Sequence, residues 1–185
     1  MLKFLDKIYE EIPLDDSADK DEQLLLYSLV RSLRPKTVVE TGTHRGVTTL
    51  ILAHAMLDAK IEGHVHTADP YSWEQQNNFD KFPELSKYIT YHSIFGRDVP
   101  VEEIDFLFID GFHEKQEVLM EWGALSPKLS ESAVVVFHDC GYPGNEACDP
   151  NGAVEQIGVP TVWIPTKNRM RIYGQAHRFG ELVGA

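Results

Sequence analysis

Short apolar segments alternate with helix-length segments along most of the chain, and this alternation limits the possible folds more than any other feature. The short segments are rich in β-branched and aromatic residues, and most of the longer ones carry apolar residues at helical spacing. Strands that alternate with helices predict a parallel sheet with helices on both faces. The five expected strands are 37–41, 64–69, 88–94, 104–110 and 132–139. The helices between them are expected within 46–59, 73–88 and 114–129, the second one broken near Pro83.

Both ends of the chain depart from this alternation. Residues 22–33 carry apolar side chains on most sides and predict a buried helix that Pro35 ends, with the acids of 15–22 as its solvated start. Residues 141–152 have the composition of a loop. Segments 160–165 and 169–174 are too close for a helical crossover, so they predict an antiparallel hairpin.

The expected fold is therefore α/β, with a doubly wound, mostly parallel sheet, helices on both faces and a C-terminal antiparallel hairpin. We find no linker within the chain and expect one domain over residues 1–185. Its parts would be N-terminal helices in 1–35, a core in 36–139, and a loop with the hairpin in 140–185.

Composition excludes several classes of partner. The formal net charge is −12, and such a surface repels phosphate backbones and anionic lipids, so we expect no nucleic acid or membrane partner. No apolar run approaches the ~20 residues that cross a bilayer. The first 16 residues are too acidic and polar for a secretory signal, which favours a cytoplasmic protein.

Two cysteines, Cys140 and Cys148, lie close together in the sequence. A secreted disulfide scaffold has a denser pattern, and disulfides are rare inside cells, so we favour two reduced thiols. A local disulfide, or a metal site shared with His138 and Asp149, are the alternatives.

The segment VVETGTHRGVTTL at 38–50 has the form of a ligand-binding turn. A strand ends near Glu40, and the chain then turns through Gly42 and Gly46, where glycine allows a tight turn and close approach to a ligand. A dinucleotide fingerprint would need glycine at the positions of His44 and Val47. This absence argues against a nicotinamide oxidoreductase and favours a nucleoside ligand without a diphosphate.

Four expected strands carry an acid at or next to their carboxyl end, namely Glu40, Asp69, Asp110 and Asp139. Ligands of such sheets bind beyond the carboxyl ends of the strands. Carboxylates crowded at one edge repel each other unless cations or hydrogen-bond donors satisfy them. Glu40 could face a cationic group and Asp69 the hydroxyls of a ribose. S-adenosylmethionine contains both of these features, together with adenine and an amino acid.

Four segments form a set of motifs, namely ETGTHRG (40–46), HVHTADPY (64–71), IDFLFIDGFHEKQEV (104–118) and SAVVVFHDC (132–140). They resemble, in order and spacing, the motifs of class I S-adenosylmethionine-dependent methyltransferases, most closely the small-molecule O-methyltransferase branch. The resemblance covers roughly residues 22–139 and implies a Rossmann-like fold and S-adenosylmethionine as cofactor.

The resemblance also implies residue roles. Gly42 and Thr43 would lie under the methionine part, and Glu40 would reach its amino group. Asp69 would bind the ribose, the end of the third strand would flank the adenine, and Asp110 would lie beside the sulfonium and the acceptor. The full set of implied cofactor residues is Glu40, Gly42, Thr43, Gly46, Asp69, Ser93, Ile94, Phe95 and Asp110.

For catalysis on a hydroxyl acceptor, His113 and His138 are the candidate bases, because imidazole titrates near neutral pH, and Asp110 completes the predicted catalytic set. The alternative is Mg²⁺ or another divalent cation held by Asp110, Asp139 and His138. Structural roles compete with both, since Asp110 could cap a helix and the histidines could bond to the backbone. Tyr71 and Trp73 could form a wall for the acceptor or the adenine or could serve packing, and we favour packing for Trp73.

These observations predict methyl transfer from S-adenosylmethionine to an oxygen of a small molecule, with or without a metal. One alternative is a hydroxylase-like relative on the same scaffold, because fold does not fix the reaction. Another is a non-catalytic accessory protein that binds S-adenosylmethionine, since the sequence has no long N-terminal lid. A further alternative is a homo-oligomer in which a second copy of the chain closes the site.

Overall fold

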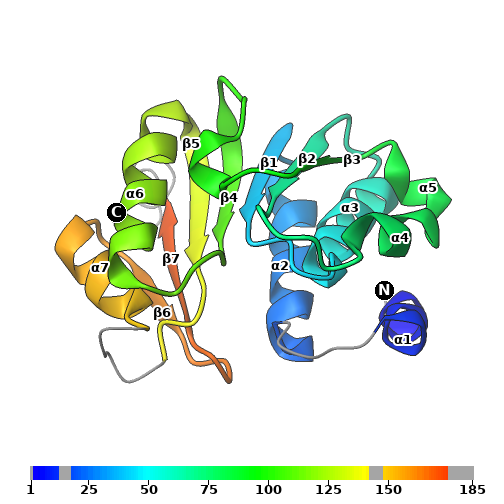
Figure 1. Cartoon of the computed structure of the whole chain (residues 1–185), viewed down its shortest axis with the longest axis horizontal. Helices are drawn as coiled ribbons and strands as arrows, with labels where there is room; N and C mark the ends of the chain where they lie inside the picture. Colours follow the sequence, from blue (N-terminus) through cyan, green and yellow to red (C-terminus); the bar gives the residue numbers. More distant parts are fainter. Residues whose placement is uncertain (1, 13–17, 142–147, 175–185) are drawn as a thin grey trace, which may run out of the picture.

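The computed structural model describes residues 2–12, 18–141 and 148–174. Within these ranges the strands form a seven-stranded sheet of order β3-β2-β1-β4-β5-β7-β6 (Figure 1). The first five strands are parallel to their neighbours, and β7 runs antiparallel to both β5 and β6. Their bounds are β1 Thr37–Thr41, β2 His64–Ala68, β3 Ile89–His92, β4 Ile104–Ile109, β5 Leu129–Phe137, β6 Val162–Ile164 and β7 Met170–Gly174.

Helices cover both faces of this sheet. In Figure 1, α1 to α5 gather on the right of the view and α6 and α7 on the left. The first group encloses one apolar cluster with the sheet, and the second group encloses another. The bounds are α1 Leu2–Glu11, α2 Lys20–Leu33, α3 Val47–Ala59, α4 Gln75–Asp80, α5 Pro83–Ser86, α6 Lys115–Leu125 and α7 Pro150–Ile157. The predicted fold class, with its hairpin, is confirmed.

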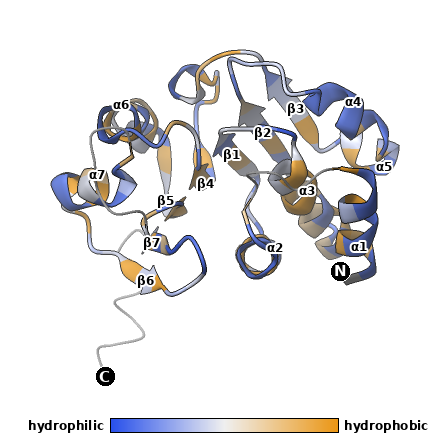
Figure 2. Cartoon of the chain, turned by 60° about the horizontal axis from the view of Figure 1, so that its bottom comes forward, coloured by the Kyte–Doolittle hydropathy of each residue, from blue (hydrophilic) through white to orange (hydrophobic). Residues whose placement is uncertain are grey.

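The sequence explains the layers. Helix α3 is apolar on nearly every side, and residues 47–56 of it are all buried. In Figure 2 it is mostly orange, whereas the outer helix α4 is mainly blue. Strands β1 and β4 lie side by side in parallel at the centre of the sheet, between the two helix layers, which explains why their segments are apolar on both faces.

The start of α2 differs from the prediction of a solvated segment. Asp19 caps the helix and Glu22 completes a capping box with it, but Glu22 is fully buried. Residues 15–17 lie outside the described residues. The helix ends at Leu33, where Arg34 turns into the left-handed region just before Pro35.

Helix α7 was not predicted, because the segment that opens it was assigned to a loop. Asp149 accepts a hydrogen bond from the backbone N–H of Gly152 at 2.9 Å and caps the helix, with Pro150 in its first turn. Asp149 is therefore a helix cap. Cys140 and Cys148 are not joined by a disulfide, and burial raises the pKa of the Cys140 thiol to about 12.

Candidate active site

A cavity of about 700 Å³ opens beyond the carboxyl ends of the parallel strands. The loops that follow β1, β2, β4 and β5 line it, together with Ala18 before α2 and the turn between β6 and β7. Four of the predicted cofactor residues line this cavity, namely Gly42, Thr43, Asp69 and Asp110. The other five, Glu40, Gly46, Ser93, Ile94 and Phe95, do not appear on its wall.

The turn after β1 depends on both of its glycines. Gly42 and Gly46 have φ angles of 83° and 82°, in the left-handed region. A Cβ on Gly42 would lie 2.0 Å from the carbonyl oxygen of Asp110, and one on Gly46 would lie 2.3 Å from Cε1 of Phe79. A side chain at Gly42, which lines the cavity, would therefore clash with the backbone of the loop after β4.

Glu40 lies beneath the cavity floor. Its Oε2 accepts hydrogen bonds from the hydroxyls of Thr49 and Thr67, the latter at 2.6 Å, while Oε1 is buried with no hydrogen-bond partner. Thr67 in turn pairs with the Thr43 hydroxyl at 2.7 Å. Burial raises the pKa of Glu40 to about 8, against the opposing effect of the two threonines. Glu40 thus connects to the cavity wall through Thr67 and Thr43.

Asp69 joins the two loops at the rim of the cavity. One of its carboxylate oxygens accepts the backbone N–H of His44 at 2.9 Å, and the other accepts that of Tyr71 at 2.9 Å. A carboxylate has about four acceptor sites, so both oxygens can still accept further hydrogen bonds.

Aromatic side chains surround the mouth of the cavity. Tyr71, Trp73 and Phe112 line it, and the Tyr71 and Phe112 rings are 6.1 Å apart. Trp73 is 43% exposed and its ring lies 5.1 Å from that of His44, so the prediction that it serves packing is wrong. The Phe95 ring lies 5.9 Å from that of Phe112 and does not line the cavity.

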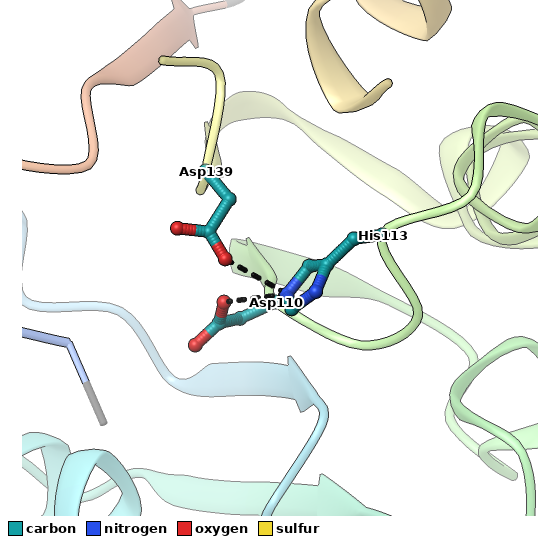
Figure 3. Close-up of side chains that lie close together, drawn as sticks. All are labelled: Asp110, His113 and Asp139. Carbon is teal, nitrogen blue, oxygen red and sulfur yellow. Dashed lines mark ion pairs between the residues drawn. The ribbon is translucent and has the colours of Figure 1, made fainter. Parts of the chain in front are cut away.

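Asp110, His113 and Asp139 form a compact group on one side of the cavity (Figure 3). Their ligand atoms lie within 4.8 Å of one another, close enough to hold one metal ion. The Nε2 atom of His113 is 2.8 Å from Asp139 Oδ2 and 3.9 Å from Asp110 Oδ1. The carboxylates of Asp110 and Asp139 raise the pKa of His113 to about 10, so the ring is protonated at neutral pH.

His138 lies behind this group and is buried. Its Nδ1 is 2.6 Å from Asp110 Oδ1, and its Nε2 is 3.0 Å from Glu22 Oε2. Burial alone would lower the pKa of His138, but the negative charges of Asp110, Asp139 and Glu22 raise it well above its ordinary value. Because carboxylates engage both ring nitrogens, His113 rather than His138 joins the two aspartates in the group that could hold a metal.

Sequence reasoning missed two acids of this region. Glu22 accepts His138 Nε2 and the backbone N–H of Asn168, at 3.0 Å each, across more than a hundred residues of chain. Glu121 on α6 lines the cavity, accepts the Thr41 hydroxyl at 2.9 Å, and has a pKa raised by burial to about 7. Its helical spacing with the buried Val118 could have revealed it, whereas no local signal indicates the role of Glu22.

Comparison with solved structures supports the fold. An O-methyltransferase from Bacillus cereus in complex with SAH matches with a TM-score of 0.73 and 15% identity, over 94% of this chain and 91% of that one. The SAH-bound methyltransferase PaMTH1 from Podospora anserina matches at 0.72 and 13%, over 92% and 85%. TomG from Streptomyces achromogenes, an O-methyltransferase in complex with SAM, matches at 0.69 and 15%, over 95% and 89%. At these identities the likeness shows the fold.

Comparison with sequences gives one curated relative and one family. The relative is the uncharacterized protein y4gI of Sinorhizobium fredii, 25% identical over 125 residues. The match covers 60% of this chain but only 14% of that protein. In the described residues, no helix is long and apolar enough to cross a membrane. The family described as a methyltransferase domain matches residues 39–140. That match covers more than half of the chain, which therefore belongs to the methyltransferase domain family.

Proposed function

We propose that the chain transfers a methyl group from S-adenosylmethionine to an oxygen of a small molecule, with a divalent cation assisting. The observation that carries this proposal is the group of Asp110, His113 and Asp139 on the wall of the cavity. It combines hard oxygen ligands with an imidazole, beside the turn that the family uses for its cofactor.

The residues present fit the cofactor. The cavity of about 700 Å³ is large enough for a nucleoside and a small second molecule. Asp69 has acceptor sites left for ribose hydroxyls, and Tyr71 and Phe112 offer ring faces for a base. The unpartnered Oε1 of Glu40 fits a nearby positive charge, because a cation would favour its ionised form. Gly42 and Thr43 would lie under the methionine part.

S-adenosylmethionine supplies an electrophilic methyl group when it is bound. The protein must then align the acceptor with that methyl group, exclude water and manage the acceptor proton. His113 and His138 are both held in the protonated form by carboxylates, so neither ring is ready to accept a proton near neutral pH. A divalent cation on Asp110 and Asp139 would remove this difficulty by making the acceptor hydroxyl more acidic.

Metal ligation would also change His113. A histidine binds a metal through a neutral ring nitrogen, so its Nε2 proton would have to leave. Asp139 is ionised already, because the hydrogen bonds from His113 and His138 lower its pKa despite its burial. With two acids as ligands, Mg²⁺ would keep several waters, which acceptor oxygens could replace.

Cofactor binding is tested by calorimetric titration with S-adenosylmethionine, its demethylated product and NADH. We expect the first two to bind and NADH not to bind. Asp69→Ala should weaken binding by ~1.5–3 kcal/mol, roughly 10- to 150-fold, since hydrogen bonds to a charged group are lost. Asp80→Ala, at an exposed acid on α4, is the matched control and should bind like wild type. Equal affinity of the two variants would refute the ribose role.

Metal assistance is tested by following formation of the demethylated product over a panel of small hydroxyl compounds. After dialysis against EDTA we expect turnover to vanish, and Mg²⁺ should restore it. Asp139→Asn should lower turnover at least tenfold while leaving cofactor affinity nearly intact. Undiminished turnover in EDTA would refute the proposal that a metal ion assists methyl transfer. Tight cofactor binding without turnover on any compound would favour the accessory-protein alternative.

A further inference from the structure

Part of the sheet face on the α6 side lacks a helical cover. Between β3 and β4 the described chain has a 3-10 turn at Gly96–Asp98 and no α-helix. Ala68, at the carboxyl end of β2, is buried in the apolar cluster beneath α6. His66 lies two residues earlier on the same face and stays partly exposed. The cover therefore ends between these two residues.

Three histidines occupy this uncovered face: His64 and His66 on β2, and His92 on the edge strand β3. All three are partly exposed. Nδ1 of His66 lies 3.1 Å from Nε2 of His92, and the planes of these two rings are inclined by 18°. The His64 ring is 5.0 Å from that of His66, and its Nε2 bonds the Thr90 hydroxyl at 2.7 Å.

This spacing is suitable for metal chelation. Imidazole nitrogens bind Zn²⁺ at about 2.0–2.1 Å, so two of them in a tetrahedral site are separated by roughly 3.3 Å. At present one ring of the His66–His92 pair donates its N–H to the other. That proton can sit on the outer nitrogen in the other tautomer, so both facing nitrogens can present lone pairs without loss of a proton.

The surroundings favour neutral rings, which metal binding requires. Burial lowers the pKa of His66 to about 4, with His64 and His92 adding to the effect, and burial also lowers the pKa of His92. No carboxylate contributes to either shift, in contrast to His113 and His138. The donors are nitrogens only, a set that suits Cu²⁺, Ni²⁺ and Zn²⁺ rather than Mg²⁺.

We propose that His66 and His92 form a two-histidine site for a divalent transition-metal ion on the uncovered β2–β3 face. The site is distinct from the group of Asp110, His113 and Asp139, and it does not depend on the methyl-transfer proposal. Water completes the coordination, because the face is open to solvent.

Cu²⁺ is the probe, because it has the highest affinity in the divalent series and its EPR spectrum reports nitrogen ligands. All measurements use the full chain carrying His113→Gln, which removes the imidazole of the acidic group. At pH 7.5 we expect this protein to bind one equivalent of Cu²⁺ with the hyperfine pattern of two nitrogens. Adding His66→Gln or His92→Gln should weaken binding at least tenfold and remove one nitrogen coupling.

His44→Gln in the same background is the matched control, since it removes a histidine at the cavity instead of one on the uncovered β2–β3 face. It should leave affinity and spectrum unchanged. Thermal melts identify any variant that fails to fold, and the His66→Gln and His92→Gln variants test the site independently. The proposal would be overturned if the His113→Gln protein did not bind Cu²⁺, or if binding were unchanged in both the His66→Gln and His92→Gln variants. Only a hydrogen bond between the two rings would then remain.

Discussion

Removal of the Glu22 carboxylate should lower the free energy of unfolding far more than removal of the carboxylate of its exposed neighbour Asp21. Glu22 is fully buried and accepts three hydrogen bonds near 3.0 Å, from the Asp19 backbone, His138 Nε2 and the Asn168 backbone. Glu22→Ala leaves all three donors unpaired, one of them on a charged ring. Adding ~1.5–3 kcal/mol for the charged donor to about 1 kcal/mol for each neutral one gives roughly 3–5 kcal/mol, the range for a broken buried ion pair.

The assay is chemical and thermal unfolding of Glu22→Ala, Glu22→Gln and Asp21→Ala, at pH 7.5 and without ligands. A loss of 3–5 kcal/mol should lower Tm by roughly 6–20 °C in a chain of this length. Glu22→Gln keeps one acceptor oxygen and should lose about half as much. Asp21 is an exposed acid in the same helical turn, and its variant should stay within ~0.5 kcal/mol of wild type.

The dependence on pH provides a second readout. Burial alone would raise the pKa of Glu22, but the hydrogen bond and charge of His138 lower it below the ordinary value of 4.5. The contribution of a group with a lowered pKa is present above that ordinary value and is lost as pH falls through the folded-state pKa. The stability gap between wild type and Glu22→Gln should thus persist from pH 6 to 8 and shrink below pH 4.5. If Glu22→Ala is as stable as Asp21→Ala, the structural role argued for Glu22 is wrong.

Two further predictions concern the end of β1 and the turn that follows it. Gly42→Ala should destabilise the fold by ~2–5 kcal/mol, because Gly42 has a positive φ and its Cβ would clash with the Asp110 backbone. The control Gly123→Ala, on the open face of α6, should be neutral or stabilising by up to ~1 kcal/mol. Equal melting points of the two variants would refute the packing argument for Gly42. The pKa of Glu40 is about 8 in the folded protein, against an ordinary value of 4.5 in the unfolded chain. As pH rises between these values, Glu40 therefore lowers the free energy of unfolding by at most ~1.4 kcal/mol per pH unit. Glu40→Gln should flatten this slope in urea titrations at pH 5.5 and 8.5, and an unchanged slope would show that Glu40 is ionised in the folded state.

The strands were predictable because their signals are local. Each predicted segment of the parallel sheet overlaps the observed strand, although β5 begins at Leu129 instead of at residue 132, and the hairpin followed from the short gap between 165 and 169. Helix α7 was missed because Asp149 and Pro150 have two meanings in a sequence. They open loops and also begin helices, and only the capping bond to Gly152 decides between them.

The site was predictable only in part, for a different reason. Glu40 near the end of β1 and the acids after β2, β4 and β5 had to reach one edge, because parallel strands bring their carboxyl ends together. Which donors satisfy each acid depends on contacts between distant segments, such as Glu22 with His138. Trp73 was assigned to packing because its sequence position gives no sign of whether its ring faces the core or the cavity.

The acids at the sheet edge differ in how their charge is balanced, and this difference decides which of them can exchange ligands. Asp69 is held by two backbone N–H groups and Glu40 by two threonines, donors that are fixed in the fold. Asp139 is balanced by the buried His138 at 3.4 Å and by His113 at 2.8 Å, and His113 is a half-exposed side chain that can rotate or lose its proton. A cation can therefore replace the charge of His113 without breaking the backbone structure of the rim. For this reason we propose the Asp110 and Asp139 side of the cavity as the place for metal or acceptor chemistry.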